Sequence, residues 1–164
     1  MLEIKTPLNG AKFETEGLGL REAPDFTATL YAGSNVSLRR EVGELPEFGL
    51  AIAGNQHHVF RTAPHQVLVI GPELETRLCM ATPLSSGRCR IEITGPKARA
   101  LLSACAAIDF SPRAFGQNAY VMTGIHHMPV LIHALSDEVF HLYGHRSFAQ
   151  SLWDWLVDAA DGLR

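Results

Sequence analysis

Apolar and polar side chains follow a strand-like pattern through much of the chain. In the first half, the stretches with this pattern are FTATLYA (26–32), NVSLRREV (35–42), HHVFRTAP (57–64) and QVLVIGP (66–72). In the second half they are RCRIEIT (88–94), AYVMTGIHH (119–127), PVLIHALS (129–136) and EVFHLYGH (138–145). Short apolar or alternating runs bounded by turn-forming residues predict strands. We expect Pro64-His65 to join two of these strands into a β-hairpin.

A Gly-Pro pair follows one apolar strand in each half. Gly71-Pro72 separates VLVI from ELETRLCMA, and Gly95-Pro96 separates IEIT from KARALLSACA. Proline suits the first turn of a helix, because its missing N–H has no intrahelical partner there. We therefore predict that each pair begins a helix directly after a strand. The buried face of the second helix is predicted to hold Ala98, Leu101, Leu102 and Cys105.

The order of these elements indicates an α+β fold, built from two similar small α/β units with antiparallel sheets. Runs of strands with segregated helices favour this class over a doubly wound parallel sheet. Residues 1–24 carry several Gly and Pro residues and little periodicity, so we expect an N-terminal arm there. The first α/β half is then predicted to span 25–82 and the second 83–164, within one compact domain overall.

The stretch HRSFAQSLWDWLVDAA (145–160) predicts a final helix. Ser147 and Gln150 have the spacing of a capping box, and Gly162 can end the helix. Its apolar positions span an arc of about 160°, whereas packing on one sheet needs a stripe of roughly 100°. Trp153 and Trp155 lie at opposite edges of this arc.

The extra width of the arc leaves two interpretations open. In the first, one edge of the helix contacts a partner, since Trp and Arg are enriched among residues that dominate binding energy. The candidate interface residues are then Arg146, Phe148, Trp153 and Trp155. In the second, both tryptophans belong to the core, because aromatic side chains often cover a sheet edge.

Composition and charge exclude several classes of protein. Apolar residues make up 46% of the chain and the net charge is −3, which is ordinary for a globular domain. No Lys/Arg run exceeds the pair Arg39-Arg40, so we expect no nucleic-acid partner. No apolar run approaches the roughly 20 residues of a membrane span, and the first residues lack the apolar segment of a signal peptide. We therefore expect a cytoplasmic protein.

Residues that could carry chemistry are scattered along the chain. Cys79, Cys89 and Cys105 have no metal-ligand spacing, and we predict that they are buried free thiols. The sequence has no dinucleotide-binding glycine motif, no phosphate-binding loop and no nucleophile elbow. We therefore predict no catalytic and no cofactor-binding residue on this chain.

The eight histidines are the remaining candidates for a metal site. The neighbours in His57-His58 and in His126-His127 would point to opposite faces if they lay on strands, so neither pair could chelate one ion. His133 and His141 could meet across a hairpin, but no carboxylate or thiolate lies at ligand spacing from them. We predict surface or rim histidines and no metal site.

Three motifs of the second half match the pattern of one protein family. Thr94-Gly95-Pro96 matches a strand that ends in (Ser/Thr)-Gly-Pro, and CAAIDF (105–110) followed by Phe115 matches a Cys-Pro-(Leu/Ile)-Asp-Leu-like segment and its phenylalanine. RSFAQSLWDWL (146–156) matches an Arg-Ser-Phe-Ala-x-x-Leu-Trp-x-Trp-Leu helix. In these motifs, and more weakly in VLVIGPE of the first half, the chain resembles the gamma subunit of heterotetrameric sarcosine oxidase.

This resemblance implies a fold related to the aminomethyltransferase-type folate-binding domain. It also implies a small accessory subunit of an oxidoreductase complex that acts on CH–NH donors. Such a complex oxidatively demethylates sarcosine or a related N-methyl amino acid and passes the one-carbon unit to tetrahydrofolate. FAD, FMN, NAD and tetrahydrofolate are then expected on the larger alpha, beta and delta subunits, and this chain is expected to form interfaces without catalysing the reaction.

Two other functions remain open at this point. One alternative is an independent folate-dependent aminomethyltransferase-like protein of the same fold, and the other is a free-standing binding module.

Overall fold

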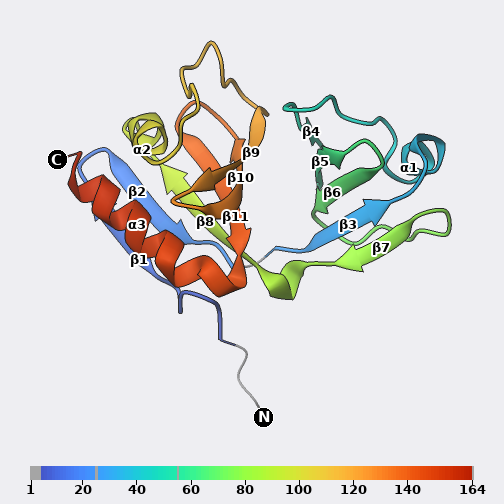
Figure 1. The fold of residues 1–164 in the computed structure, drawn as a ribbon, viewed down its shortest axis with the longest axis horizontal. Helices are drawn as coiled ribbons and strands as arrows, with labels where there is room; N and C mark the ends of the chain where they lie inside the picture. Colours follow the sequence, from blue (N-terminus) through green and yellow to red (C-terminus); the bar gives the residue numbers. More distant parts are fainter. Residues whose placement is uncertain (1–4, 25, 55, 164) are drawn as a thin grey trace. The chain divides into compact units, whose positions relative to one another are not determined.

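The computed structural model describes residues 5–24, 26–54 and 56–163. The chain divides into two compact units (Figure 1). Unit 1 comprises Met1–Pro24, Gly87–Gln117 and Val121–Arg164, and unit 2 comprises Asp25–Ser86 and Asn118–Tyr120. Among the described residues, no helix has both the length and the apolar character that crossing a bilayer requires.

A six-stranded antiparallel sheet forms the centre of unit 1. Its order is β1-β2-β8-β11-β10-β9. The strands are β1 (Lys12–Thr15), β2 (Leu18–Glu22), β8 (Arg88–Thr94), β9 (Tyr120–Ile125), β10 (Met128–Ala134) and β11 (Val139–His145). The four strands predicted in the second half are confirmed, because each coincides closely with a stretch that the alternation selected.

One face of this sheet is covered by the helices α2 (Ala98–Cys105) and α3 (Ala149–Asp161), which Figure 1 shows beside the strands. On β8, Cys89, Ile91 and Ile93 are buried, whereas the residues between them are half-buried. At Gly144 of β11 the backbone lies so close to α3 that an added Cβ would stand 3.0 Å from Leu152 Cδ2. This apolar face, together with the helices, forms the core of the unit.

The prediction of an arm over 1–24 is wrong for the part of it that the structure describes. β1 and β2 pair with each other, and β2 also pairs with β8, where Gly19 stands opposite Thr94. The buried Glu22 carboxylate fixes the preceding loop, because it accepts hydrogen bonds from Thr6 Oγ1 at 2.7 Å, Leu8 N at 2.9 Å and Gly10 N at 2.6 Å. Pairing with the distant strand β8 holds this N-terminal segment in the sheet. The pattern of apolar and polar residues within the segment does not show such a contact.

Unit 2 contains a five-stranded antiparallel sheet of order β4-β5-β6-β3-β7. The strands are β3 (Ala28–Ala32), β4 (Ile52–Ala53), β5 (His58–Ala63), β6 (Gln66–Ile70) and β7 (Met80–Pro83), and a 3-10 turn, η1 (Ser85–Gly87), follows. The predicted hairpin is confirmed: β5 and β6 are antiparallel neighbours on either side of Pro64-His65.

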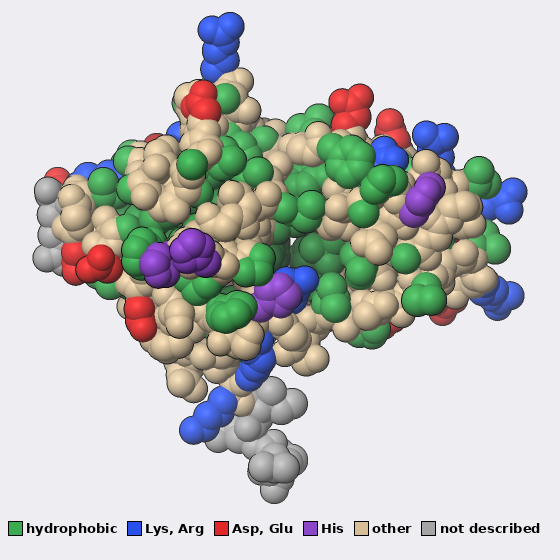
Figure 2. Space-filling view, viewed as in Figure 1, with side chains coloured by type: hydrophobic (Ala, Val, Ile, Leu, Met, Phe, Trp, Pro, Cys, Tyr) green, Lys and Arg blue, Asp and Glu red, His purple; other side chains and the backbone are tan. Residues whose placement is uncertain are grey.

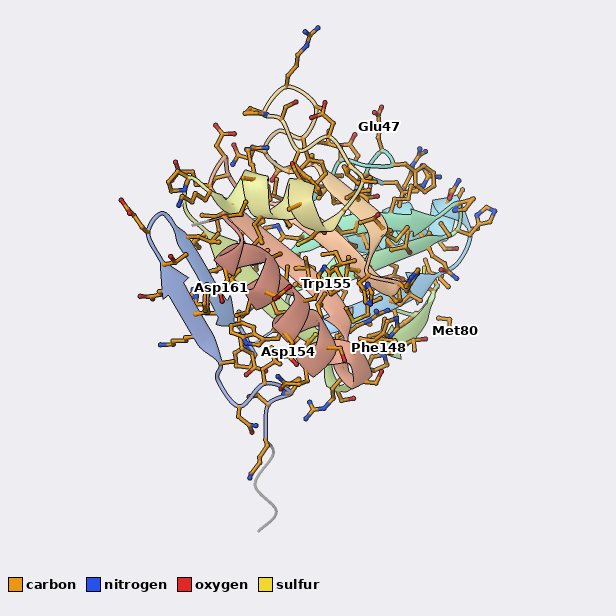
Figure 3. The ribbon with its side chains drawn as sticks, turned by 60° about the vertical axis from the view of Figure 1, so that its left-hand side comes forward. Glu47, Met80, Phe148, Asp154, Trp155 and Asp161 are labelled. Atoms are coloured by element: carbon orange, nitrogen blue, oxygen red, sulfur yellow. The ribbon has the colours of Figure 1, made fainter. Side chains whose placement is uncertain are left out.

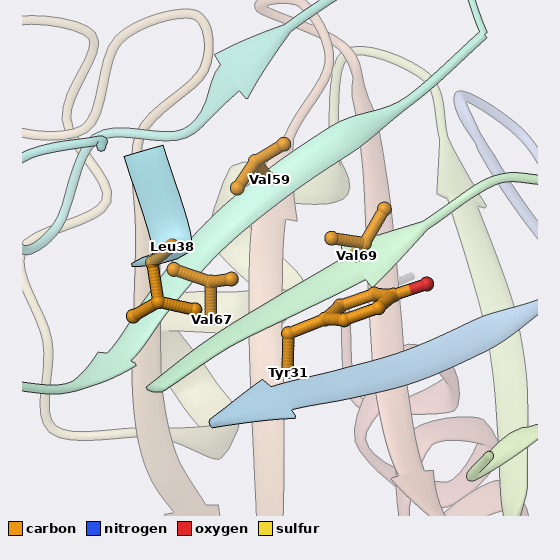
Figure 4. Close-up of a cluster of buried hydrophobic side chains, with 5 residues drawn as sticks. All are labelled: Tyr31, Leu38, Val59, Val67 and Val69. Atoms are coloured by element: carbon orange, nitrogen blue, oxygen red, sulfur yellow. The ribbon is translucent and has the colours of Figure 1, made fainter. Parts of the chain in front are cut away.

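A helix stands where a strand was predicted over 35–42. In α1 (Asn35–Val42), the side chain of Ser34 accepts a hydrogen bond from Ser37 N and caps the first turn, and Gly43 ends the helix with φ 81°. Leu38 is the residue of this short helix that is fully buried. It packs with four side chains of the sheet, as Figure 4 shows: Tyr31, Val59, Val67 and Val69.

A helix follows the Gly-Pro pair in one unit, as predicted, and none follows it in the other, where the prediction is wrong. After β8, the chain turns at Gly95-Pro96 and α2 begins two residues later at Ala98, so Pro96 precedes the first helical turn. After β6, residues 71–79 form no helix. Their backbone is instead held by side chains, since Leu74 N donates to the Tyr31 hydroxyl at 2.8 Å and Leu78 N donates to Glu41 Oε1 at 3.2 Å.

Candidate partner interface

The C-terminal helix begins later than its sequence predicts. Residues Arg146–Phe148 form a 3-10 turn, η2, and Ala149 N donates to Arg146 O as α3 starts. No side chain caps this end, so the predicted Ser147–Gln150 capping box is wrong. The Gln150 side chain instead donates to Asp154 Oδ1 at 2.8 Å, one turn along the helix. Gly162 follows the last helical residue, as predicted.

The two tryptophans of α3 lie in different environments. Trp153 is 8% exposed and lies on the buried side of the helix with Leu152 and Leu156. Trp155 is 39% exposed and extends from the helix, as Figure 3 shows. The structure therefore supports the core interpretation for Trp153 and leaves Trp155 at the surface, where a partner can reach it.

Trp155 is held by a histidine that the sequence does not connect with it. The rings of Trp155 and His126 stack with centroids 4.0 Å apart and an interplanar angle of 14°. His126 and His127 form the two-residue turn between β9 and β10, with φ values of 43° and 67°. Positive φ at both positions suits a type I′ hairpin turn. The expectation that this pair lies on a strand is therefore wrong, and the turn presents His126 to α3.

A second aromatic contact lies at the start of α3. Phe148 is 44% exposed, and its ring packs edge-on against His145, the last residue of β11, with centroids 6.4 Å apart. Arg88 Nη1 donates to His145 Nε2 at 3.1 Å. Burial, followed by the nearby Arg88 charge, lowers the pKa of His145, so this ring stays a neutral acceptor near pH 7. Arg146 is exposed and donates to Lys5 O at 2.6 Å.

The sheet face that points away from α2 and α3 carries an ionisable row. Arg21 Nε lies 2.6 Å from Glu92 Oε1, and His141 Nε2 lies 3.1 Å from Glu92 Oε2. The hydrogen bond from Arg21 is the main cause that lowers the pKa of Glu92. His133 stands opposite His141 in the register, as predicted for a hairpin. The row joins β2 to β8 by an ion pair and β8 to β11 by the contact of Glu92 with His141. Sequence spacing could not reveal it, because its members lie far apart in the chain.

Metal-ligating residues do not converge in the part of the chain that the structure describes. No group of three or more His, Cys, Asp or Glu side chains there could hold an ion. Cys89 and Cys105 are buried free thiols, as predicted, whereas Cys79 is half-buried. Burial raises the pKa of Cys105 to about 11, which keeps it protonated and unreactive near pH 7. These residues pack in the units, and the surface of α3 remains the candidate site.

The fold with its two antiparallel sheets resembles part of an aminomethyltransferase. The glycine cleavage system aminomethyltransferase T from Bartonella henselae matches with a TM-score of 0.65 at 11% identity, over 94% of this chain and 57% of that chain. At such low identity the likeness shows the fold alone, and it confirms the α+β class and the aminomethyltransferase-type fold that the sequence implied.

A family model described as "Sarcosine oxidase, gamma subunit family" matches residues 11–162. The chain therefore belongs to the sarcosine oxidase gamma subunit family. The sarcosine oxidase gamma subunit of Corynebacterium sp. strain P-1 is 29% identical over 156 residues, which cover 87% of this chain and 74% of that protein. The gamma subunit of Corynebacterium sp. strain U-96 is 29% identical over 165 residues, 96% of this chain and 80% of that protein.

One solved structure shares the fold over almost the whole chain. It is the heterotetrameric sarcosine oxidase from Corynebacterium sp. U-96 in complex with pyrrole 2-carboxylate. The TM-score is 0.86 at 22% identity, and the match covers 97% of this chain and 95% of that chain.

Proposed function

We propose that this chain is a small accessory subunit of a heterotetrameric sarcosine oxidase-like complex. The observation that carries the proposal is the family match over residues 11–162. The full-length likeness to a chain of a heterotetrameric sarcosine oxidase supports it. The complex would oxidatively demethylate sarcosine or a related N-methyl amino acid in the cytoplasm and pass the one-carbon unit to tetrahydrofolate.

In this proposal the chain forms interfaces, and the redox chemistry belongs to larger alpha, beta and delta subunits. FAD, FMN, NAD and tetrahydrofolate would be held by these subunits. An exposed tryptophan and an exposed phenylalanine on α3 and the turn before it fit such a role, because aromatic side chains are enriched where protein partners meet. The interface residues proposed here are Arg146, Phe148 and Trp155.

An independent aminomethyltransferase-like protein is the second candidate, and the shared fold favours it. The match to the Bartonella aminomethyltransferase, however, covers only 57% of that enzyme. A subunit whose partners supply the remaining parts of an assembly explains this partial match more directly than an independent enzyme does.

Affinity purification tests the proposal. The tagged chain, co-expressed with the proteins encoded beside its gene, should co-purify with larger flavin-containing subunits, and native mass spectrometry should show a defined complex. The isolated chain should carry no flavin absorbance. A chain that stays monomeric in the presence of these proteins, or one that alone holds stoichiometric flavin, would contradict the proposal.

A pair of tryptophan variants separates folding from assembly. Trp153→Ala should cost about 3–5 kcal/mol of folding stability, because a large buried side chain is lost. Trp155→Ala should cost only about 1 kcal/mol of folding stability, from the lost stack on His126, and should weaken assembly by about 2 kcal/mol or more, as expected of an interface anchor. Denaturation curves and binding titrations of both variants measure the two effects. The reverse pattern would place the partner on the Trp153 edge.

A further inference from the structure

The outward face of α3 carries its charges in an unusual order. At its start, the exposed Arg146 lies in η2, and the first turn of the helix holds no acidic residue. Asp154 lies near the middle of the helix, and Asp158 and Asp161 lie in its last turn; all three are exposed, and the last turn holds no basic residue. Figure 3 shows Asp154 and Asp161 along this helix. The face therefore runs from basic to acidic along the chain.

This order opposes the helix dipole. A helix N-terminus carries partial positive charge and favours acidic side chains, and a C-terminus favours basic ones. Charges placed the other way round weaken the isolated helix. Surface charges that disfavour a helix and bring no gain in stability are expected at functional positions.

The contacts within the described residues compensate this order only in part. Lys97 Nζ donates to Leu163 O at 3.3 Å, just beyond the helix end. Asp154 accepts a neutral hydrogen bond from Gln150. No ion pair to Asp154 or Asp158 forms within the described chain. The two carboxylates are therefore available to cations of another molecule.

Two exposed aromatic side chains accompany these charges. Phe148 lies in η2 and Trp155 lies in the second turn of α3. The Trp155 ring is stacked on His126, so its orientation is set before a partner binds. Figure 2 shows histidine and hydrophobic side chains side by side on the surface of the protein.

We propose that the outward face of α3 docks a segment of a partner subunit with the complementary charge order. The segment presents basic side chains to Asp154 and Asp158, an acidic side chain to Arg146, and an apolar or planar cationic side chain to Trp155. Charge complementarity selects this occupant, because an acidic or uncharged segment would leave the carboxylates unpaired. The inference rests on the proposed function and adds the site and the chemistry of its partner.

Neutral variants of the two carboxylates test this proposal. Asp154→Asn/Asp158→Asn keeps the size of both side chains and removes two charges. The isolated variant should melt at the same temperature as the wild type or higher, because the Asp158 charge lies in the last turn and opposes the dipole. Its affinity for the co-expressed larger subunits should fall at least tenfold at low salt. The salt dependence of binding should become weaker, since fewer ionic contacts form.

The matched control is Glu14→Gln/Glu16→Gln, which removes two charges from β1 and the turn after it. It should bind like the wild type. The inference is overturned if the Asp154/Asp158 variant assembles as the wild type does, or if it melts at a lower temperature when isolated. If the wild-type chain itself captures no larger subunit, the proposed function fails, which is a different outcome.

Discussion

Strands β6 and β8 are each followed by a Gly-Pro pair, and the chain then takes two different paths. After β8, Ala98 N donates to Gly95 O at 3.0 Å and α2 continues for two turns. After β6, Leu74 N donates to the Tyr31 hydroxyl and the chain stays irregular until β7. The two stretches share their Gly-Pro pair, so the difference arises from the side chains that come after the pair.

The residues after each pair differ in how much apolar surface they can bury. In α2 the buried positions recur at helical spacing, and they are Ala98, Leu101, Leu102 and Cys105. In 71–79, Leu74 is half-buried and Leu78 is 49% exposed. Most helical stability in proteins comes from tertiary packing of an apolar face. A Gly-Pro pair thus marks the end of a strand, and the buried stripe decides whether a helix forms after it.

The largest expected effect contrasts one leucine from each stretch. Leu102→Ala removes a fully buried side chain and should lower the free energy of unfolding by about 3 kcal/mol, within the usual range of roughly 2–5 kcal/mol. Leu74→Ala should cost about 1 kcal/mol, because the side chain is half-buried. Urea denaturation of both variants measures this. Equal losses of unfolding free energy in the two variants would contradict the inference that the two stretches differ in how much apolar surface they bury.

The glycines of the two Gly-Pro pairs test the feature that both stretches have in common. A Cβ at Gly95 would lie 2.5 Å from Gly17 O, and one at Gly71 would lie 2.2 Å from Gln56 O. Both glycines also have positive φ, so each Ala variant should lose about 2 kcal/mol of stability. Gly87→Ala is the control, since its Cβ would meet nothing within 4 Å. A tolerated Gly71→Ala would show that the turn is required only where a helix comes next.

The smallest effect is expected at the hydroxyl that holds the irregular stretch. Tyr31→Phe removes the group that accepts from Leu74 N at 2.8 Å and donates to Leu74 O at 3.2 Å. The loss should be about 1 kcal/mol, typical of hydrogen bonds in a partly buried site. Hydrogen exchange of the Leu74 amide should become faster, while amides of α2 keep their protection. An unchanged Leu74 amide would show that the hydroxyl does not hold this stretch.

The sequence predicts the strands better than it predicts the short or distant elements. Alternating or continuous apolar runs located β3, β5, β6 and the strands of the second half, because the side chains of these strands are buried on one face or, in β6 and β10, largely on both. The same pattern missed β1 and β2, which are held in place by pairing with β8 and by the buried Glu22. It also predicted a strand where α1 lies, because a helix with a single buried leucine shows no helical periodicity. Pairing between residues so far apart in the chain cannot be recognised from the side-chain pattern of a short segment.

The candidate interface was predictable in part. Residues Arg146, Phe148 and Trp155 are exposed, so they can serve the predicted role, whereas Trp153 is buried. Helical spacing put both tryptophans at the edges of one apolar arc, but only the packing of the unit decides which edge is covered. The stack of His126 on Trp155 could not be predicted, because it depends on a hairpin turn that local sequence places on a strand.

Unit 1 is built from three separate segments of the chain, so its sheet can be completed only late in synthesis. Unit 2 is almost continuous, 25–86 with only 118–120 added, so nearly all of it is synthesised before the second half of unit 1. Unit 1 pairs β2 with β8 and then β8 with β11, and it cannot close its sheet until β11 has emerged from the ribosome. Pairings between residues so far apart in sequence form late, because a long loop must close first. The helix α3 follows β11 in the chain, so the surface that we assign to a partner is completed only after the strands of both described sheets have been synthesised.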